Sequence, residues 1–327
     1  MEHLLERRRA EASARLDELR TALSRAAEIA EGKACVYVTG SFGRGEASRH
    51  SDLDLFIVGR ADGDRRLLSR LDEISIEAQL IEGSRRLGFP EFSGDGEYLQ
   101  HYTASRLVES LGTPQDDAAN TFTARLLLLL ESRPLIGPDT YSEAIDQVLE
   151  KYWLEFEDHR DDFMPAFLGN DILRLWRTFC VNYEARTMRE PAEKKAKRRL
   201  KNYKLKHSRL LTCYSGLAFL LATFVEHGTV RRSDARQMVE LSPTQRLEWL
   251  SGRSRFEACR TTIAELLDSY ERFLANTDAS ESALITQFMD AATSSMRLEE
   301  LGGFGDLMWR LLQEVGGRSP FLRMLVV

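Results

Sequence analysis

The hydrophobic pattern of the chain begins with a long amphipathic segment. Between residues 3 and 31, leucine and alanine recur at roughly helical spacing, while arginine and glutamate fill most other positions. This pattern predicts one helix. We expect it to end near Gly32, because glycine commonly follows the last residue of a helix.

The pattern then changes to the period of strands. Residues 34–38 (ACVYV) are β-branched and aromatic, which predicts a short buried strand. In residues 52–58 (DLDLFIV), apolar side chains alternate with Asp52 and Asp54. A strand with this alternation would place both carboxylates on one face.

The remaining pattern becomes increasingly helical. Residues 64–82 suggest a helix followed by a strand at 74–81, and residues 86–93 suggest a short strand weakened by Pro90. From about residue 97, the period is helical, with a strong helix at 120–132.

We therefore predict an α+β protein, in which a small mixed-sheet domain precedes an all-helical domain. The expected boundaries are an N-terminal helix at 1–33, the α/β domain at 34–140 and the helical domain at 141–327.

Composition excludes several classes of protein. The 327 residues carry a net charge of -6, which argues against general coating of nucleic acid but leaves local basic regions open. The four cysteines form no CxxC pair, so neither a zinc site nor a disulfide framework is expected. No apolar run is long enough to cross a membrane, and the N-terminus lacks a signal-peptide core, so we expect a cytoplasmic protein.

A glycine-rich segment, residues 40–55 (GSFGRGEASRHSDLDL), joins the two predicted strands. A glycine-rich turn can offer backbone N–H groups to phosphate oxygens, and the Ser41 hydroxyl adds another donor. Asp52 and Asp54 are costly to bury without cations or other partners. Mg²⁺ prefers one or two carboxylates together with phosphate oxygens. The segment predicts a magnesium-dependent phosphoryl-transfer site, although aspartates beside glycine also occur in inactive turns.

This segment resembles the signature of the DNA polymerase β-like nucleotidyltransferases, a Gly-Ser turn followed by Asp-x-Asp. Its Arg-Gly-Glu and Ser-Asp-Leu-Asp elements are similar to those of small bacterial members. These include aminoglycoside nucleotidyltransferases, the PII-uridylyltransferase domain and minimal nucleotidyltransferases of toxin–antitoxin modules. The resemblance implies transfer of an NMP from an NTP, with Mg²⁺ or Mn²⁺ as the cofactor and pyrophosphate as the leaving group.

The resemblance also implies roles for individual residues. Asp52 and Asp54 would bind the metal, and a third carboxylate would complete the catalytic set, with Glu91 as the candidate and Asp95 or Glu77 as alternatives. Arg44 has a second interpretation, in which it simply pairs with Glu46. The nucleotide-binding residues implied in this segment are Gly40, Ser41, Arg44, Gly45 and Ser51.

The segment 189–209 (REPAEKKAKRRLKNYKLKHSR) is the one strongly basic run. It can neutralise the phosphates of an RNA or of a triphosphate, and Tyr203 could stack on a base. The alternative is a solvated loop and helix start. By resemblance to related enzymes, Lys204 and Lys206 are candidates for contact with the triphosphate.

The acceptor is left open by the sequence. A protein side chain or an RNA end is favoured, ahead of an antibiotic-modifying enzyme or a synthase of signal oligonucleotides. We expect the acceptor to lie between the two domains, and no membrane partner. The competing hypothesis is a non-catalytic module that binds nucleotide or acts within a toxin–antitoxin pair. The oligomeric state is not predicted.

Overall fold

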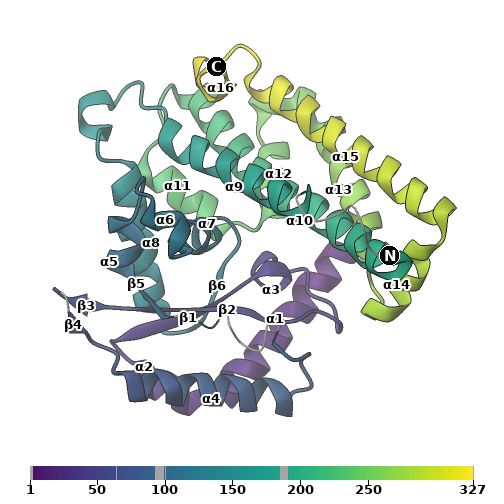
Figure 1. Cartoon of the computed structure of the whole chain (residues 1–327). Coiled ribbons are helices and arrows are strands. Elements are labelled where there is room, and N and C mark those ends of the chain that lie inside the picture. Colours follow the sequence, from purple (N-terminus) through teal and green to yellow (C-terminus); the bar gives the residue numbers. More distant parts are fainter. Residues whose placement is uncertain (1–2, 64, 93–98, 100, 185–190, 327) are drawn as a thin grey trace. The chain divides into compact units, whose positions relative to one another are not determined.

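The computed structural model of the chain describes residues 3–63, 65–92, 99, 101–184 and 191–326 (Figure 1). The chain divides into two compact units, Met1–Leu154 and Glu155–Val327. The first unit combines a mixed sheet with helices, and the second is helical. This confirms the predicted fold class. The units divide after Leu154, whereas the boundary expected at residue 141 falls inside a helix of the first unit.

The first unit contains a four-stranded sheet with strand order β5-β2-β1-β6. β1 is antiparallel to both β2 and β6, whereas β2 and β5 are parallel. A separate two-stranded hairpin, β3–β4, follows β2. The strands are β1 (Ala34–Thr39), β2 (Asp54–Gly59), β3 (Ala61–Asp62), β4 (Arg65–Arg66), β5 (His101–Thr103) and β6 (Arg133–Ile136). The helices are α1 (Leu4–Ala22), α2 (Ser24–Ala30), α3 (Gly40–Arg44), α4 (Arg70–Arg86), α5 (Ala104–Glu109), α6 (Gln115–Ala118), α7 (Thr121–Leu130) and α8 (Pro138–Tyr152).

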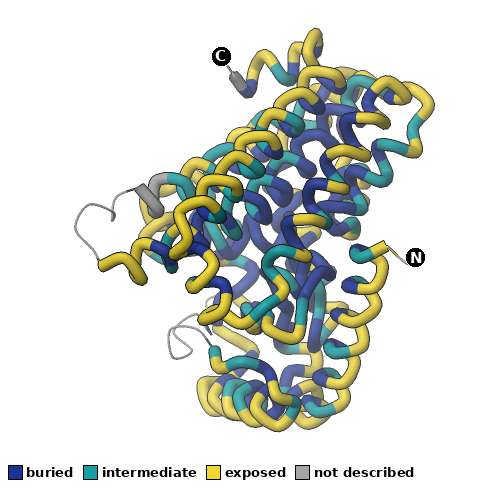
Figure 2. The backbone as a smooth tube through the Cα atoms, turned by 90° about the vertical axis from the view of Figure 1, so that its right-hand side faces the viewer, coloured by how far each residue is buried: buried dark blue, intermediate teal, exposed yellow. Residues whose placement is uncertain are grey.

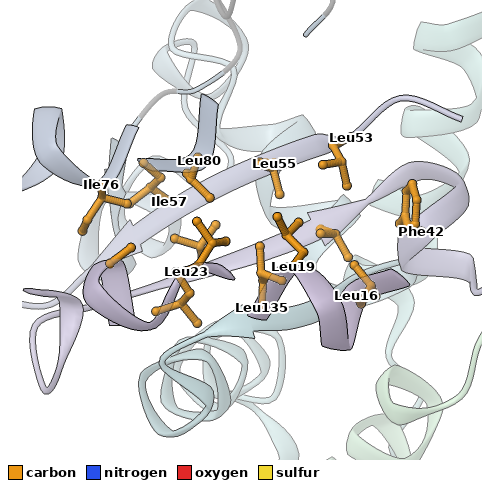
Figure 3. Close-up of a cluster of buried hydrophobic side chains, with 14 of the residues drawn as sticks. Leu16, Leu19, Leu23, Phe42, Leu53, Leu55, Ile57, Ile76, Leu80 and Leu135 are labelled. Atoms are coloured by element: carbon orange, nitrogen blue, oxygen red, sulfur yellow. The ribbon is translucent and has the colours of Figure 1, made fainter. Parts of the chain in front are cut away.

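The two faces of the sheet have different cores. One face packs aliphatic side chains from the strands against α1, α2 and α4, and Figure 3 shows Leu55 and Ile57 facing Leu19, Leu23 and Leu80. The opposite face is aromatic, because alternation along the strands directs other side chains there. On this face, Tyr37 stacks on Phe56 with ring centroids 5.5 Å apart. Tyr141 of α8 contacts Tyr37 on this face, with ring centroids 5.9 Å apart, so both faces of the sheet are covered.

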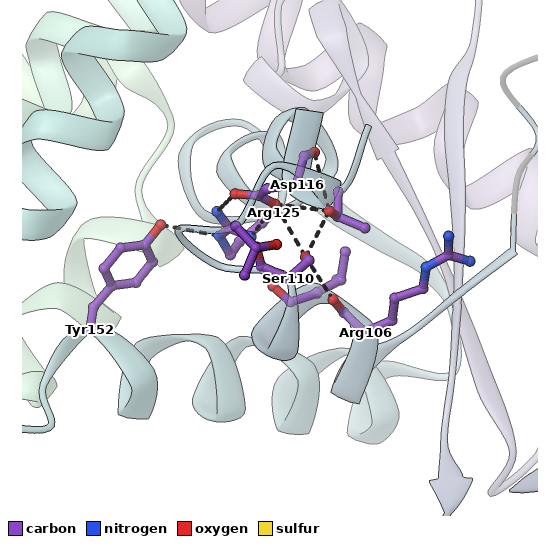
Figure 4. A network of polar contacts seen from close by, with 8 residues as sticks. Arg106, Ser110, Asp116, Arg125 and Tyr152 are labelled. Atoms are coloured by element: carbon purple, nitrogen blue, oxygen red, sulfur yellow. Dashed lines mark hydrogen bonds and ion pairs between the residues drawn. The ribbon is translucent and has the colours of Figure 1, made fainter. Parts of the chain in front are cut away.

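A buried polar network connects four helices of the first unit, α5, α6, α7 and α8 (Figure 4). The Arg125 guanidinium donates two hydrogen bonds to the Asp116 carboxylate, at 2.9 and 2.6 Å, and a third to the Tyr152 hydroxyl. Ser110 and Thr121 also donate to Asp116. The network therefore joins α5, α6, α7 and α8 around one ion pair that is 0% exposed.

α4 corrects one prediction from the sequence. The strand expected at residues 74–81 is wrong, because this segment lies within the helix Arg70–Arg86. Its buried positions include Glu73, Ile76 and Leu80, which follow the spacing of a helix rather than of a strand. The Ser69 hydroxyl accepts a hydrogen bond from the Asp72 N–H and caps the helix.

Three other predictions for the first unit need adjustment. The helix expected at 3–31 is interrupted at Leu23, whose backbone leaves the helical region (φ -106°, ψ 19°). Residues 87–92 form no strand, and residue 93 lies outside the described residues. β5 and β6 were not expected at all. Both are short, and their pairing with β2 and β1 joins segments distant in sequence.

The second unit is built around one long helix, α10. The Tyr203 and His207 rings of α10 contact Phe273 on α13, and His207 also contacts Phe304 on α15. The helices are α9 (Ala166–Glu184), α10 (Ala192–His227), α11 (Arg232–Glu240), α12 (Pro243–Ser251), α13 (Arg260–Asn276), α14 (Glu281–Met289), α15 (Ala291–Gly316) and α16 (Pro320–Val326), with short 3₁₀ helices at Phe156–His159 and Ser254–Cys259.

Burial follows the amphipathic pattern in both units. Along most helices in Figure 2, dark blue positions alternate with yellow ones at the spacing of one buried face. α10 contains a window that is long and apolar enough to cross a membrane, but 72% of it is buried among protein. That degree of burial is typical of the core helix of a globular unit.

Candidate active site

Two strands and a short helix bring the two parts of the glycine-rich segment together. β1 ends at Thr39, whose partner in the register is Asp54, the first residue of β2. α3 starts directly after β1, so Gly40 lies beside Asp54. The expected Gly-Ser turn is therefore the first turn of a helix, with half-buried Ser41 as its second residue.

Glycine is required at position 40 by two features. Its φ of +63° lies in the left-handed region, which costs other L-residues about 1–2 kcal/mol. A Cβ at this position would also overlap Oδ2 of Asp54. Because Gly40 has no side chain, its backbone can lie close to the half-buried carboxylate of Asp54.

A buried ionic network of Arg44, Glu46 and Glu131 holds α3 in place. The Arg44 guanidinium donates to Oε1 of Glu46 at 2.6 Å and to Oε2 of Glu131 at 2.9 Å. Oε1 of Glu131 accepts a hydrogen bond from the Gly40 N–H at 3.2 Å. The structure shows the pairing of Arg44 with Glu46, and contact of Arg44 with a phosphate stays a prediction. Charge-assisted bonds of this kind are about twice as strong as neutral ones, so the network fixes both ends of α3.

The loop between α3 and β2 is ordered by its own polar groups. Gly45 ends α3 with a φ of +71°. The Ser51 hydroxyl accepts a hydrogen bond from the Ser48 N–H at 3.0 Å, and the Arg15 guanidinium donates to the Ser48 carbonyl at 2.9 Å. Ser51 thus shapes the loop that leads into the Asp-x-Asp segment.

The predicted carboxylates are placed differently from one another. Asp54 opens β2, whereas Asp52 is exposed in the loop before it, so strand alternation does not set the direction of Asp52. Glu91 is exposed in the segment after α4. Of the alternatives, Asp95 lies outside the described residues, and Glu77 lies on α4, where burial, and then neighbouring Glu73, raise its pKa.

These carboxylates do not form one compact cluster. Within the part of the chain that the structure describes, no three His, Cys, Asp or Glu side chains are grouped closely enough to hold a metal ion. The structure therefore unites Gly40 with Asp54 but does not gather Asp52, Asp54 and Glu91 into a three-residue set. The third metal ligand stays a prediction.

A comparison with protein families bears on this region. Residues 16–89 match the model of the nucleotidyltransferase domain family. The first unit carries a nucleotidyltransferase domain. The matched range starts within α1, ends at residue 89 just after α4, and includes α3 and the whole of β2. No curated protein and no solved structure matched the chain.

The basic residues predicted to assist the nucleotidyltransferase domain lie in the second unit. Lys204 and Lys206 are half-buried on α10. The suggestion that Tyr203 could stack on a base is wrong. Its ring is buried (1% exposed) and its hydroxyl donates to Glu300 at 3.0 Å. The alternative for the basic run was a solvated loop and helix start. In the described part of this run, the structure shows no loop from Ala192 onward, because α10 begins there.

The residue that sequence reasoning missed is Glu131. It forms hydrogen bonds with Gly40, which is 91 residues away in the sequence, and with Arg44, which is 87 residues away. The one available signal was its position, since it is an acidic residue directly after a run of five leucines. A carboxylate at the end of a buried helix needs a partner, and here that partner is the nucleotidyltransferase signature itself.

Proposed function

We propose that this protein transfers an NMP from an NTP to an acceptor hydroxyl, with a protein side chain or RNA as the favoured acceptor. The observation that carries this proposal is the contact between Gly40 and Asp54 within a nucleotidyltransferase domain. It places backbone N–H groups at the start of a helix next to a carboxylate, which suits a phosphate chain and its counter-ion.

The residues present fit a divalent cation. Asp54 and Asp52 supply carboxylate oxygens, the ligands that Mg²⁺ prefers, and Oδ2 of Asp54 lies close to the backbone of Gly40 at the start of α3. A bound Mg²⁺ or Mn²⁺ would neutralise the charge of the triphosphate. The Ser41 hydroxyl and the N–H groups that follow Gly40 in α3 would orient the phosphates, because the Gly40 N–H itself donates to Glu131.

The reaction requires an in-line displacement at the α-phosphorus. The acceptor oxygen forms a bond to this phosphorus, the bond to the bridging oxygen of the β-phosphate breaks, and pyrophosphate leaves. The proton of the acceptor hydroxyl passes to a nearby base, for which a carboxylate of the site is the candidate. The protein contributes positioning and charge, as phosphoryl transfer demands.

The test is to incubate the purified protein with each α-labelled NTP, Mg²⁺ and a cell lysate, and then to separate protein, RNA and small molecules. We expect label in one fraction. The double variant Asp52→Asn/Asp54→Asn should lose roughly 100-fold or more of the rate, because several kcal/mol of charge stabilisation disappear. The control Asp62→Asn/Asp139→Asn removes two exposed carboxylates of the same unit and should retain activity.

The second candidate function is a nucleotide-binding module without turnover. It is favoured by the lack of a three-carboxylate group among the described residues. Measurable NTP binding with no label in any fraction would support this module, and full activity of the Asp52/Asp54 variant would contradict our assignment of the carboxylates.

A further inference from the structure

The N-terminal half of α10 contains the most strongly basic segment of the sequence. Residues 191–209 contain nine lysines and arginines and one carboxylate, Glu193, in a chain whose net charge is -6. In the structure this segment is helical from Ala192 onward. The nine cations are therefore arranged on a rigid helix.

One face of this helix is already occupied by the core. Ala196, Leu200, Tyr203, His207 and Leu211 are all buried, at spacings of three and four residues. They form a single stripe, which packs through its rings on α13, α14 and α15. The most exposed cations lie away from this stripe.

Four basic side chains form the exposed part of the surface. They are Lys194, Lys195, Arg199 and Lys201. Lys197 is different, because it pairs with Glu281 of α14 at 3.1 Å. Arg209 lies over the Phe179 ring, 5.0 Å from its centroid. The other four are exposed to solvent and can meet a ligand from outside the unit.

The arrangement favours an extended polyanion over a compact one. A triphosphate needs cations that converge on one point, whereas these residues are spread along a helix. From Lys194 to Lys201 the helix rises about 10 Å, which is comparable to roughly three phosphates at the 3.4 Å rise per phosphate of one strand in a duplex. The buried Tyr203 removes the aromatic platform, so contact would involve the backbone rather than the bases.

We propose that the exposed basic face of α10, formed by Lys194, Lys195, Arg199 and Lys201, binds single-stranded RNA through its phosphates. This binding is independent of sequence and sensitive to salt. The choice of RNA rests on the proposed function, because RNA offers the hydroxyl acceptor that nucleotidyl transfer requires. Binding itself needs neither nucleotide nor turnover.

The test measures binding of the full chain to a labelled single-stranded RNA without NTP, at several salt concentrations. We expect the variant Lys194→Gln/Lys195→Gln/Arg199→Gln/Lys201→Gln to bind at least about 10-fold more weakly. Its plot of log affinity against log salt should also be shallower by about 0.7 for each lost contact. A matched control replaces four exposed arginines of the same unit with glutamine, Arg232, Arg255, Arg272 and Arg318.

The control has the same change in net charge, so equal weakening of both variants would overturn the proposal. So would unchanged binding by the α10 variant, or binding to an acidic peptide but not to RNA. The Asp52→Asn/Asp54→Asn variant should bind RNA normally. Loss of labelling in that variant with intact RNA binding separates failure of catalysis from failure of this surface.

Discussion

Glycine is required at position 40 by its backbone conformation and by its closeness to Asp54, and substitutions can separate these two effects. Replacement by alanine forces a side chain into the left-handed region and also against Asp54. We expect Gly40→Ala to lower the free energy of unfolding by at least about 1–2 kcal/mol. We also expect it to reduce nucleotidyl transfer by about 10-fold or more, because Asp54 must move. Denaturant unfolding and the labelling assay measure the two effects.

The control for this prediction is Gly32→Ala. Gly32 has nearly the same φ, +65°, but a Cβ there would meet nothing within 4 Å. This variant should lose similar stability from backbone strain and keep its activity. Equal loss of activity in both variants would show that strain alone, and not contact with Asp54, explains the effect.

The local part of the site could be predicted from the sequence. Gly40, Ser41 and Asp54 fall within 15 residues, and the change from strand to glycine to strand indicated their proximity. Glu131 could not be predicted, because it contacts Gly40 through tertiary structure across 91 residues. Asp52 was assigned to the strand, but β2 begins two residues later.

The buried ion pair between Arg125 and Asp116 joins four helices of the first unit. Its removal tests how much this pair stabilises the packing of those helices. Asp116→Asn should leave the Arg125 charge without a counter-charge in the interior and cost about 3–5 kcal/mol of stability. Glu143→Gln removes the partner of Arg60 in a largely exposed pair and should cost less than about 1 kcal/mol. Urea unfolding of the two variants distinguishes them, and equal losses would contradict the structural role of the buried pair.

Burial raises the pKa of Asp116, but hydrogen bonds from Arg125, Thr121 and Ser110 outweigh burial and hold that pKa below its ordinary value. The unfolded chain therefore binds the proton more tightly than the folded one. The stabilisation by Asp116 is complete above about pH 4 and is lost as the pH falls through the lower pKa of the folded state.

His207 makes the helices of the second unit sensitive to mild acid. Burial lowers its pKa to about 4, while the unfolded chain retains the ordinary value near 6.5. The unfolded state therefore binds more protons between these values, and stability falls as the pH drops from about 6.5 to 4. We expect a loss of about 2 kcal/mol between pH 7.5 and 5, measured by urea unfolding.

Two variants check the assignment to His207. His207→Phe should unfold with a smaller dependence on pH over the same range, because no proton can be taken up at that position. His227→Gln removes an exposed histidine at the end of the same helix and should leave the dependence intact. An unchanged dependence in His207→Phe would assign the effect to other groups.

The amphipathic helices of the second unit were predictable where the pattern repeats over several turns, as it does in α13. β5 and β6 span three and four residues and show too few periods for alternation to appear. Part of α4, residues 74–81, was assigned to a strand. The buried Leu80 and Gly83 complete a helical spacing that this short window concealed.

Each of the two units of the molecule has a hydrophobic core of its own, one around the sheet and one around α10. A unit with its own core can fold alone. We predict that residues 155–327, expressed separately, unfold cooperatively in urea, show helical circular dichroism and retain RNA binding without nucleotidyl transfer. A fragment that lacks cooperative unfolding would contradict this division of the chain.

The ion pair between Arg44 and Glu131 limits how the glycine-rich segment can be transplanted. A graft or minimal enzyme cut at the limits of the family match, residues 16–89, would carry Arg44 and Glu46 but discard Glu131. In the new protein, the Arg44 guanidinium would keep Glu46 but lose Glu131 as a partner. The Gly40 N–H would also lose its hydrogen-bond acceptor. Any engineered chimera must therefore include the chain through β6, or supply a carboxylate at the equivalent place.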